Sequence, residues 1–154
     1  MPHERSPRQI ARNDKISLEI VRSHLSKVWL IGSLMLGLVL IAQSVAGHYG
    51  AEPLPAWKWY LGSVMPVTTL IMGALCYTAL KPEALQYIVR RSFYRVALVL
   101  SSVYLLLIGL TIAIEPLVPI GIFDLMRMSN YWLAPFQTLV ASAIGALFFK
   151  SSPR

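Results

Sequence analysis

The side chains that most often carry chemistry are few in this sequence and lie far apart. They are three histidines, His3, His24 and His48, and a single cysteine, Cys76. A haem inside a membrane needs two ligands that face each other at one depth, but His24 and His48 flank the same long apolar run. One cysteine forms neither an internal disulfide nor a paired-cysteine metal site within one chain. The sequence predicts no catalytic set, cofactor or metal site, and we expect a protein that is not an enzyme.

Ionisable residues are also missing from the long apolar runs. Residues 28–51, 59–80, 96–114 and 128–149 contain no Asp, Glu, Lys or Arg. An ionisable residue inside a membrane span is usually functional, so this absence disfavours proton-coupled transport and ion-pair relays. About 20 residues cross the hydrocarbon core as a helix, and backbone polar groups in lipid must be bonded internally. We therefore predict an all-α membrane protein with a transmembrane domain over 28–150. The four expected spans are about 28–47, 58–80, 96–114 and 131–149.

Positive charge predicts the orientation of these helices. The net charge is +7, and 12 of the 14 Lys and Arg residues lie in the N-terminal segment, the middle loop and the C-terminus. Positive charge stays on the cytoplasmic side, so we expect an inner-membrane protein with both termini in the cytoplasm. We expect the cations there to bind anionic lipids and not nucleic acid. The predicted membrane-surface cations are Lys15, Arg22, Lys27, Arg90, Arg91 and Arg95.

The cytoplasmic segment over 1–27 ends in the pattern of a basic amphipathic helix. Its apolar stripe consists of Leu18, Val21, Leu25 and Val28, and its cations lie off that stripe. Such a helix typically lies in the membrane interface. We favour a separate surface helix that starts near Lys15 and that acts as a passive anchor or as a gate for the first span. The alternative is a simple cytoplasmic extension of that span.

The two halves of the chain share an order of motifs that indicates two tandem helical hairpins. The shared motifs are Glu-Pro-Leu at 52–54 and 115–117, Pro-x-x-Thr-Leu at 66–70 and 135–139, and Gly-Ala-Leu at 73–75 and 145–147. Because both halves begin on one side of the membrane, such a duplication must be parallel. The spacings differ between the halves, and membrane hairpins share composition, so chance similarity is the alternative.

Uncharged polar and small residues within the spans are candidates for a pore lining or for helix packing. They are Thr69, Thr138, Ser142, Gly145, Pro66 and Pro135. Gly145 and its neighbours Ala141 and Ser142 predict a close helix contact, and we expect Thr68 and Thr69 to bond the carbonyls that Pro66 frees. Glu52 and Glu115 are candidates for an outer rim, since carboxylates at a pore mouth attract cations. The alternative is that the hydroxyls bond backbone within the bundle and that both glutamates are solvated.

Two functions remain open at this level. The first is an oligomeric pore, channel or membrane-perturbing protein, and the second is an accessory or assembly subunit of a larger membrane complex. Either reading implies a homo-oligomer or a membrane-protein partner. The apolar outer loop over 115–130 is expected to lie along the membrane surface or to contact such a partner.

Overall fold

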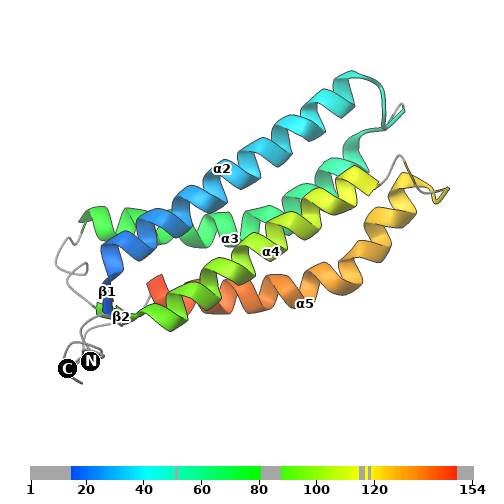
Figure 1. The fold of residues 1–154 in the computed structure, drawn as a ribbon. Coiled ribbons are helices and arrows are strands. Elements are labelled where there is room, and N and C mark those ends of the chain that lie inside the picture. The colour runs from blue at the N-terminus through cyan, green and yellow to red at the C-terminus, as the bar shows by residue number, and fades with distance from the viewer. Residues whose placement is uncertain (1–14, 51, 81–87, 115–116, 118, 149–154) are drawn as a thin grey trace, which may run out of the picture.

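The protein is a bundle of four long helices with a small two-stranded sheet at one end (Figure 1). The computed structural model describes residues 15–50, 52–80, 88–114, 117 and 119–148, and the side chains of Lys15, Thr78 and Ile88 are not described. The elements are β1 (Lys15–Ser17), α2 (Leu18–Val45), α3 (Leu54–Leu80), β2 (Ile88–Arg90), α4 (Arg91–Ile114) and α5 (Ile122–Phe148). All four helices are long and apolar enough to cross a membrane. The predicted fold, a multi-pass membrane protein with four helical spans, is confirmed.

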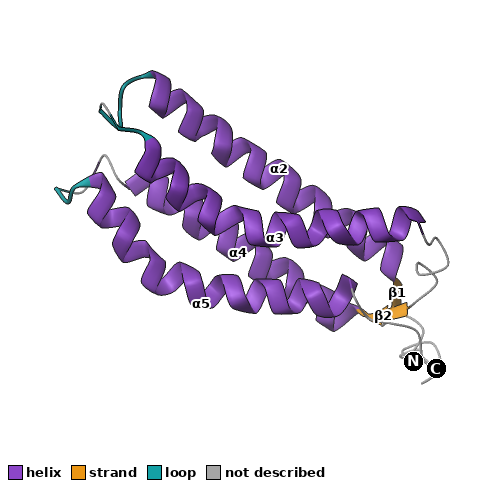
Figure 2. Cartoon of the chain, turned by 180° about the vertical axis from the view of Figure 1, so that it is seen from behind, coloured by secondary structure: helices purple, strands orange, loops and turns teal. Residues whose placement is uncertain are grey.

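The strands place the starts of α2 and α4 side by side. β1 pairs with β2 in antiparallel register, with Ile16 opposite Val89, and each strand continues directly into a helix. The end of α5 lies at the same end of the bundle, because the guanidinium of Arg22 donates a hydrogen bond to the backbone carbonyl of Phe148. The helices therefore run up, down, up and down, as Figure 2 also shows.

Helix α2 ends where the sequence supplies a glycine. Its C-terminal residue Val45 is followed by Ala46, and Gly47 has a φ of 75°. Glycine adopts this left-handed conformation without the steric penalty of a Cβ atom, and so it ends helices at this position. The reversal places the start of α3 beside the end of α2.

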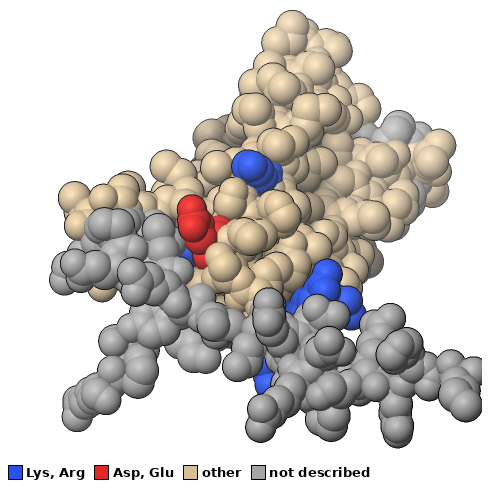
Figure 3. Space-filling model, turned by 60° about the vertical axis from the view of Figure 1, so that its left-hand side comes forward, with Lys and Arg blue, Asp and Glu red and all other residues tan. Residues whose placement is uncertain are grey.

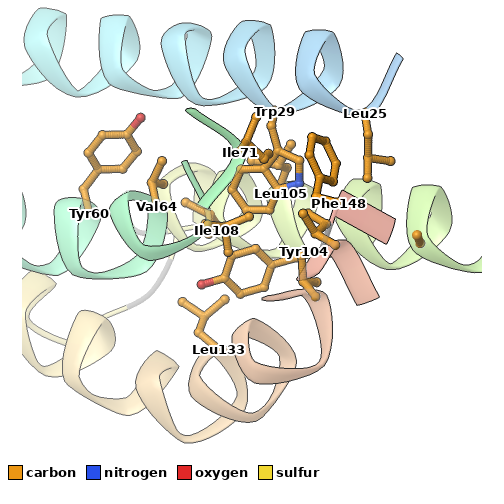
Figure 4. Packing of buried hydrophobic residues seen from close by; sticks show 14 of the residues in the cluster. Leu25, Trp29, Tyr60, Val64, Ile71, Tyr104, Leu105, Ile108, Leu133 and Phe148 are labelled. Carbon is orange, nitrogen blue, oxygen red and sulfur yellow. The ribbon is translucent and has the colours of Figure 1, made fainter. Parts of the chain in front are cut away.

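The helices pack as α2 beside α4 and α3 beside α5, with α4 and α5 also in extensive contact. Large side chains fill the space between them, among them Trp29, Tyr104, Leu133 and Phe148 (Figure 4). The rings of Trp29 and Tyr104 lie 5.9 Å apart, centroid to centroid, between α2 and α4. Because lipid provides little hydrophobic drive between helices, such close packing is what holds the bundle together.

Three contacts of β1 and α2 with β2 and α4 share one offset along the sequence. Ile16 pairs with Val89, the Cβ position of Gly32 lies against Leu105, and that of Gly109 lies against Leu36. The two residues of each pair are 73 positions apart in the sequence. Two parallel helices in contact keep such an offset whatever their origin, and the shared motifs are 63, 69 and 72 positions apart. The parallel hairpin duplication therefore stays a prediction.

The expected surface helix over 15–27 is wrong. Residues Lys15–Ser17 form β1, and the helical part is the first turns of α2 itself. The apolar stripe of Leu18, Val21 and Leu25 is fully buried. Burial against other helices removes more apolar surface than a position in the interface would, and so the helix continues straight into the bundle. The simple extension of the first span is the correct alternative.

The expected outer loop over 115–130 is also corrected. From Ile122 onward this segment is the first part of α5, and Met126 and Ser129 are buried. Its apolar residues therefore lengthen the fourth helix to 27 residues. The helix starts nine residues before the predicted residue 131, and its first turns include the charged Asp124 and Arg127.

The tight contact of α2 with α4 gives a first prediction. A Cβ atom at Gly32 would lie 2.8 Å from Cδ1 of Leu105, so Gly32→Leu overpacks this contact. We expect a loss of about 1–3 kcal/mol in the free energy of unfolding, measured by denaturant titration in detergent micelles. Leu105→Ala in the same chain should restore part of the loss. A loss that Leu105→Ala leaves unchanged or increases would contradict the proposed contact.

Candidate functional site

A proline halfway along α3, Pro66, determines one set of hydrogen bonds between the helices. Pro66 has no N–H group, so the carbonyl of Gly62, four residues earlier, lacks its helical donor. Helix α3 nevertheless runs without interruption from Leu54 to Leu80. The side-chain amide of Gln137 on α5 donates to the Gly62 carbonyl at 3.0 Å and lies 3.2 Å from the Ser63 carbonyl. A neighbouring helix thus replaces the hydrogen bond that the proline removes.

The other helices contribute to the same level of the bundle. The hydroxyl of Tyr104 on α4 donates to the Ser63 carbonyl at 2.9 Å, and the hydroxyl of Tyr60 on α3 donates to the Ser33 carbonyl on α2. Closer to the loop end, Trp59 Nε1 donates to Ser129 Oγ at 2.9 Å. These bonds join all four helices through uncharged groups.

The expectation that Thr68 and Thr69 bond the freed carbonyl is wrong. Thr68 donates to the Val64 carbonyl at 3.0 Å, and Thr69 donates to the Met65 carbonyl at 2.9 Å. Both hydroxyls therefore reach back one turn along their own helix, to carbonyls other than that of Gly62. Their geometry in α3 does not allow them to reach the carbonyl that Gln137 binds.

The candidate pore or packing residues lie on the outside of the described bundle. Thr69 and Pro66 on α3 are exposed, as are Pro135, Thr138 and Ser142 on α5. Gly145 is partly exposed, and nothing in the described part of the chain lies within 4 Å of an added Cβ atom there. The close contact expected at Gly145 is therefore not made by the described residues of one copy. Ala141 is partly buried against the core.

The predicted membrane-surface cations separate into two groups. Lys27, Arg90, Arg91 and Arg95 are exposed at the strand-bearing end, where Lys and Arg side chains interrupt a largely uncharged surface (Figure 3). Arg22 is only 3% exposed. Its guanidinium lies over the ring of Phe148, with Cζ 5.4 Å from the centroid. The side chain of Lys15 is not among those that the structure describes.

The buried Arg22 carries donors without acceptors. Its Nε and Nη1 atoms have no hydrogen-bond partner among the described residues, and neither does the hydroxyl of Ser26, one turn further along α2. The sequence contains a signal for this burial, since Arg22, Ser26, Trp29 and Ser33 recur at helical spacing and all four are buried. Sequence reasoning missed it because it assigned the segment before Val28 to the membrane surface.

The outer rim is described only in part. Glu52 is exposed in the connection between α2 and α3, and Glu115 lies outside the described residues. Within the part of the chain that is described, no three His, Cys, Asp or Glu side chains are grouped so that they could hold a metal ion. The arrangement therefore offers hydrogen-bond donors, an uncharged polar surface and one buried cation.

Comparison with known proteins adds no further assignment. No protein-family model, curated protein sequence or solved structure matches this chain. The functional argument therefore depends on the fold and on the residues described above.

The proline junction gives a second prediction. Gln137→Leu should lower the free energy of unfolding by about 1 kcal/mol, the usual scale of hydrogen bonds between membrane helices. In a Pro66→Ala background the loss should be smaller, because an alanine at position 66 supplies an N–H group to the Gly62 carbonyl. A double-mutant cycle in micelles measures this coupling.

Thr138→Val is the matched control for this cycle, since its hydroxyl donates to the Ala134 carbonyl on its own helix. The change in the free energy of unfolding caused by Thr138→Val should be equal with proline and with alanine at position 66. If Gln137→Leu costs as much with alanine at position 66 as with proline, the amide does not compensate for the proline.

Proposed function

We propose that this protein is a non-enzymatic inner-membrane protein that assembles with copies of itself into a pore. The chain lies in the membrane with both termini in the cytoplasm, and the subunits meet through the outer faces of α3 and α5. One observation carries the proposal, namely the contrast between these two faces and those of α2 and α4.

The outer faces of α2 and α4 carry large aliphatic side chains. On α2 the exposed residues include Ile31, Leu34, Leu38 and Val39, and on α4 they include Val96, Val99, Val103 and Leu106. These are the side chains that partition best into hydrocarbon. Since α2 and α4 lie next to each other, they give the molecule one side suited to lipid.

The outer face of α3 differs in one strip, which lies beside the exposed Leu61, Met65 and Met72. Gly62, Pro66, Thr69, Gly73 and Cys76 follow one another at helical spacing, and all five are exposed. We call this row the small-residue face. Nothing described lies within 4 Å of an added Cβ atom at Gly62 or Gly73. Small residues allow helix backbones to approach closely, so a row of them suits a contact with another helix.

The neighbouring helix α5 continues this character. Pro135, Thr138 and Ser142 are exposed at helical spacing, and the bond from Gln137 to Gly62 places this part of α5 beside the small-residue face. Thr69 and Thr138 have satisfied hydroxyl protons, so their oxygen lone pairs remain for water or ions. In an oligomer, Gly62 and Gly73 of the small-residue face support the subunit contact, and Thr69, Thr138 and Ser142 at its edge supply an uncharged polar lining.

The need for several copies follows from the interior of one copy. The space between the four helices holds large buried side chains, including Trp29, Tyr104 and Phe148. A conduit lined by Thr69, Thr138 and Ser142 would run along the outside of the bundle and closes only when other copies surround it. The runner-up function is an accessory subunit, in which a different membrane protein covers the same face.

Assembly is tested by filling the small-residue face. Gly73→Leu meets no described neighbour in one chain, so the monomer should fold normally while the oligomer is weakened. We expect a shift from oligomer to monomer in native mass spectrometry from micelles, with helix content unchanged. The control is Val99→Leu on the outer face of α4. With this variant the particle should keep the mass of the oligomer.

An oligomer that survives Gly73→Leu would contradict the proposed contact. If the wild-type particle contains one copy bound to a fixed second protein, the pore is excluded and the protein is an accessory subunit. These two outcomes are read from the same spectra.

Conduction is tested with cysteines in a Cys76→Ser chain reconstituted in liposomes. Thr138→Cys should react with a membrane-impermeant, charged thiol reagent, and the reaction should reduce ion flux at least several-fold. Val103→Cys on α4 should neither react nor change the flux. Absence of flux from the unmodified oligomer would exclude the pore.

A further inference from the structure

A groove runs along the membrane-spanning part of α2 and α3 and changes character along its length. Its first part, about 340 Å³, lies at the strand-bearing end and is lined by Glu19, Arg22, Ser23, Ser26, Lys27, Leu30 and Leu75. Its second part, also about 340 Å³, is almost wholly apolar. Leu30 lines both parts. The two are therefore adjacent, with a charged end and an apolar end.

We infer that this groove binds one anionic phospholipid, with the phosphate beside Arg22, Ser26 and Lys27 and an acyl chain along the apolar part. This inference rests on the groove between α2 and α3 and does not depend on the pore. The charged end lies where the distribution of Lys and Arg predicts the cytoplasmic leaflet. Basic pockets between membrane helices on that side are suited to anionic headgroups.

The charged end is prepared for an anion. Arg22 is 3% exposed, and its Nε and Nη1 atoms lack partners among the described residues, as does the Ser26 hydroxyl. Arg22 and Ser26 are one turn apart and so lie on the same side of α2. A buried cation with unused donors is costly, and a phosphate in the adjacent groove lowers that cost through its charge. Hydrogen bonds to Nε, Nη1 or the Ser26 hydroxyl would require these enclosed atoms to turn toward the groove.

The charge at this end matches a phosphodiester. Arg22 and Lys27 carry two positive charges and Glu19 carries one negative charge, which leaves a net charge of +1. A phosphodiester carries one negative charge. Lys27 is exposed at the rim, where its flexible side chain can follow the headgroup.

The apolar end matches an acyl chain in length and chemistry. It runs along α2 from Leu30 to Ile41 and along α3 from Trp57 to Thr68. At 1.5 Å per residue, the α2 wall is about 16 Å long, and half of the hydrocarbon core is about 15 Å thick. The groove therefore begins near the expected cytoplasmic headgroup level and continues to Trp57 at the outer end of α3. An acyl chain from the cytoplasmic leaflet would occupy the part nearest Leu30.

The test measures displacement of a fluorescent phosphatidylglycerol from the purified full-length protein in micelles. Unlabelled phosphatidylglycerol should displace the probe, and phosphatidylcholine and inorganic phosphate should do so at least tenfold less well. Displacement by phosphatidylcholine at equal concentration would overturn the selectivity for an anion. Displacement by inorganic phosphate at equal concentration would show that the apolar part contributes nothing, which overturns the lipid as ligand.

Two variants and two controls assign the site without disturbing the buried Arg22. Lys27→Gln should weaken phosphatidylglycerol about fivefold, the effect of one cation near a membrane surface. Leu30→Trp should fill the junction of the two parts and abolish binding of the probe. The controls are Arg95→Gln, an exposed cation at the same end, and Val103→Trp on α4. Leu30 and Val103 are 39% and 40% exposed.

Both controls should bind the probe within twofold of the unchanged protein. Equal losses in a variant and in its control would mean that the lipid adheres to the whole surface, and would overturn the site. Unchanged binding of the probe in both Lys27→Gln and Leu30→Trp would also overturn the site.

Discussion

One constraint sets how the closely packed helices are placed, which is that a carbonyl without a donor is costly in lipid. Pro66 leaves the Gly62 carbonyl without its helical partner, and an unsatisfied backbone group in the hydrocarbon core costs several kcal/mol. Gln137 supplies the missing donor from α5, and Tyr104 binds the adjacent Ser63 carbonyl from α4. Because these donors must meet fixed acceptors, the depth and rotation of α4 and α5 relative to α3 are fixed as well.

This constraint explains why the two sides of the molecule differ. Gln137 faces α3, so the residues beside it on α5, including Thr138, are turned outward next to the small-residue face. The aliphatic surfaces lie on α2 and α4, where contacts such as Gly32 with Leu105 follow the register of the strand pair. One side is thus suited to lipid and the other to close helix contact, and the proposed assembly uses this difference.

The two hairpins differ in how closely their helices pack. Helices α4 and α5 are in contact over much of their length, whereas α2 and α3 share fewer contacts. The groove with Arg22 at its charged end lies between the less closely packed pair. A lipid in this groove would fill the space and would give the bundle a contact with the leaflet that the charge distribution predicts to be cytoplasmic.

The sequence predicts the four helices because a span needs a long uncharged run, and this requirement is read directly from residue types. It does not predict where α2 begins, since Arg22 and Lys27 resemble the end of a span and only burial by other helices shows otherwise. The three-residue strands are too short for a periodic pattern. The partner of the Gly62 carbonyl is 75 residues away in the sequence, and only the packing of α5 against α3 brings it there.

The account depends most on which surface meets lipid in the assembled protein, and oxygen accessibility of spin labels in a bilayer measures this directly. Labels are placed, in a Cys76→Ser chain, at Thr69 on the small-residue face and at Val99 on α4, both of them exposed in one copy. A site covered by a neighbouring copy or facing pore water meets less oxygen than a site in lipid, because oxygen dissolves better in hydrocarbon than in water. The account predicts a several-fold lower oxygen collision rate at position 69 than at position 99. Equal rates at both positions would contradict it, because the small-residue face would then lie in lipid.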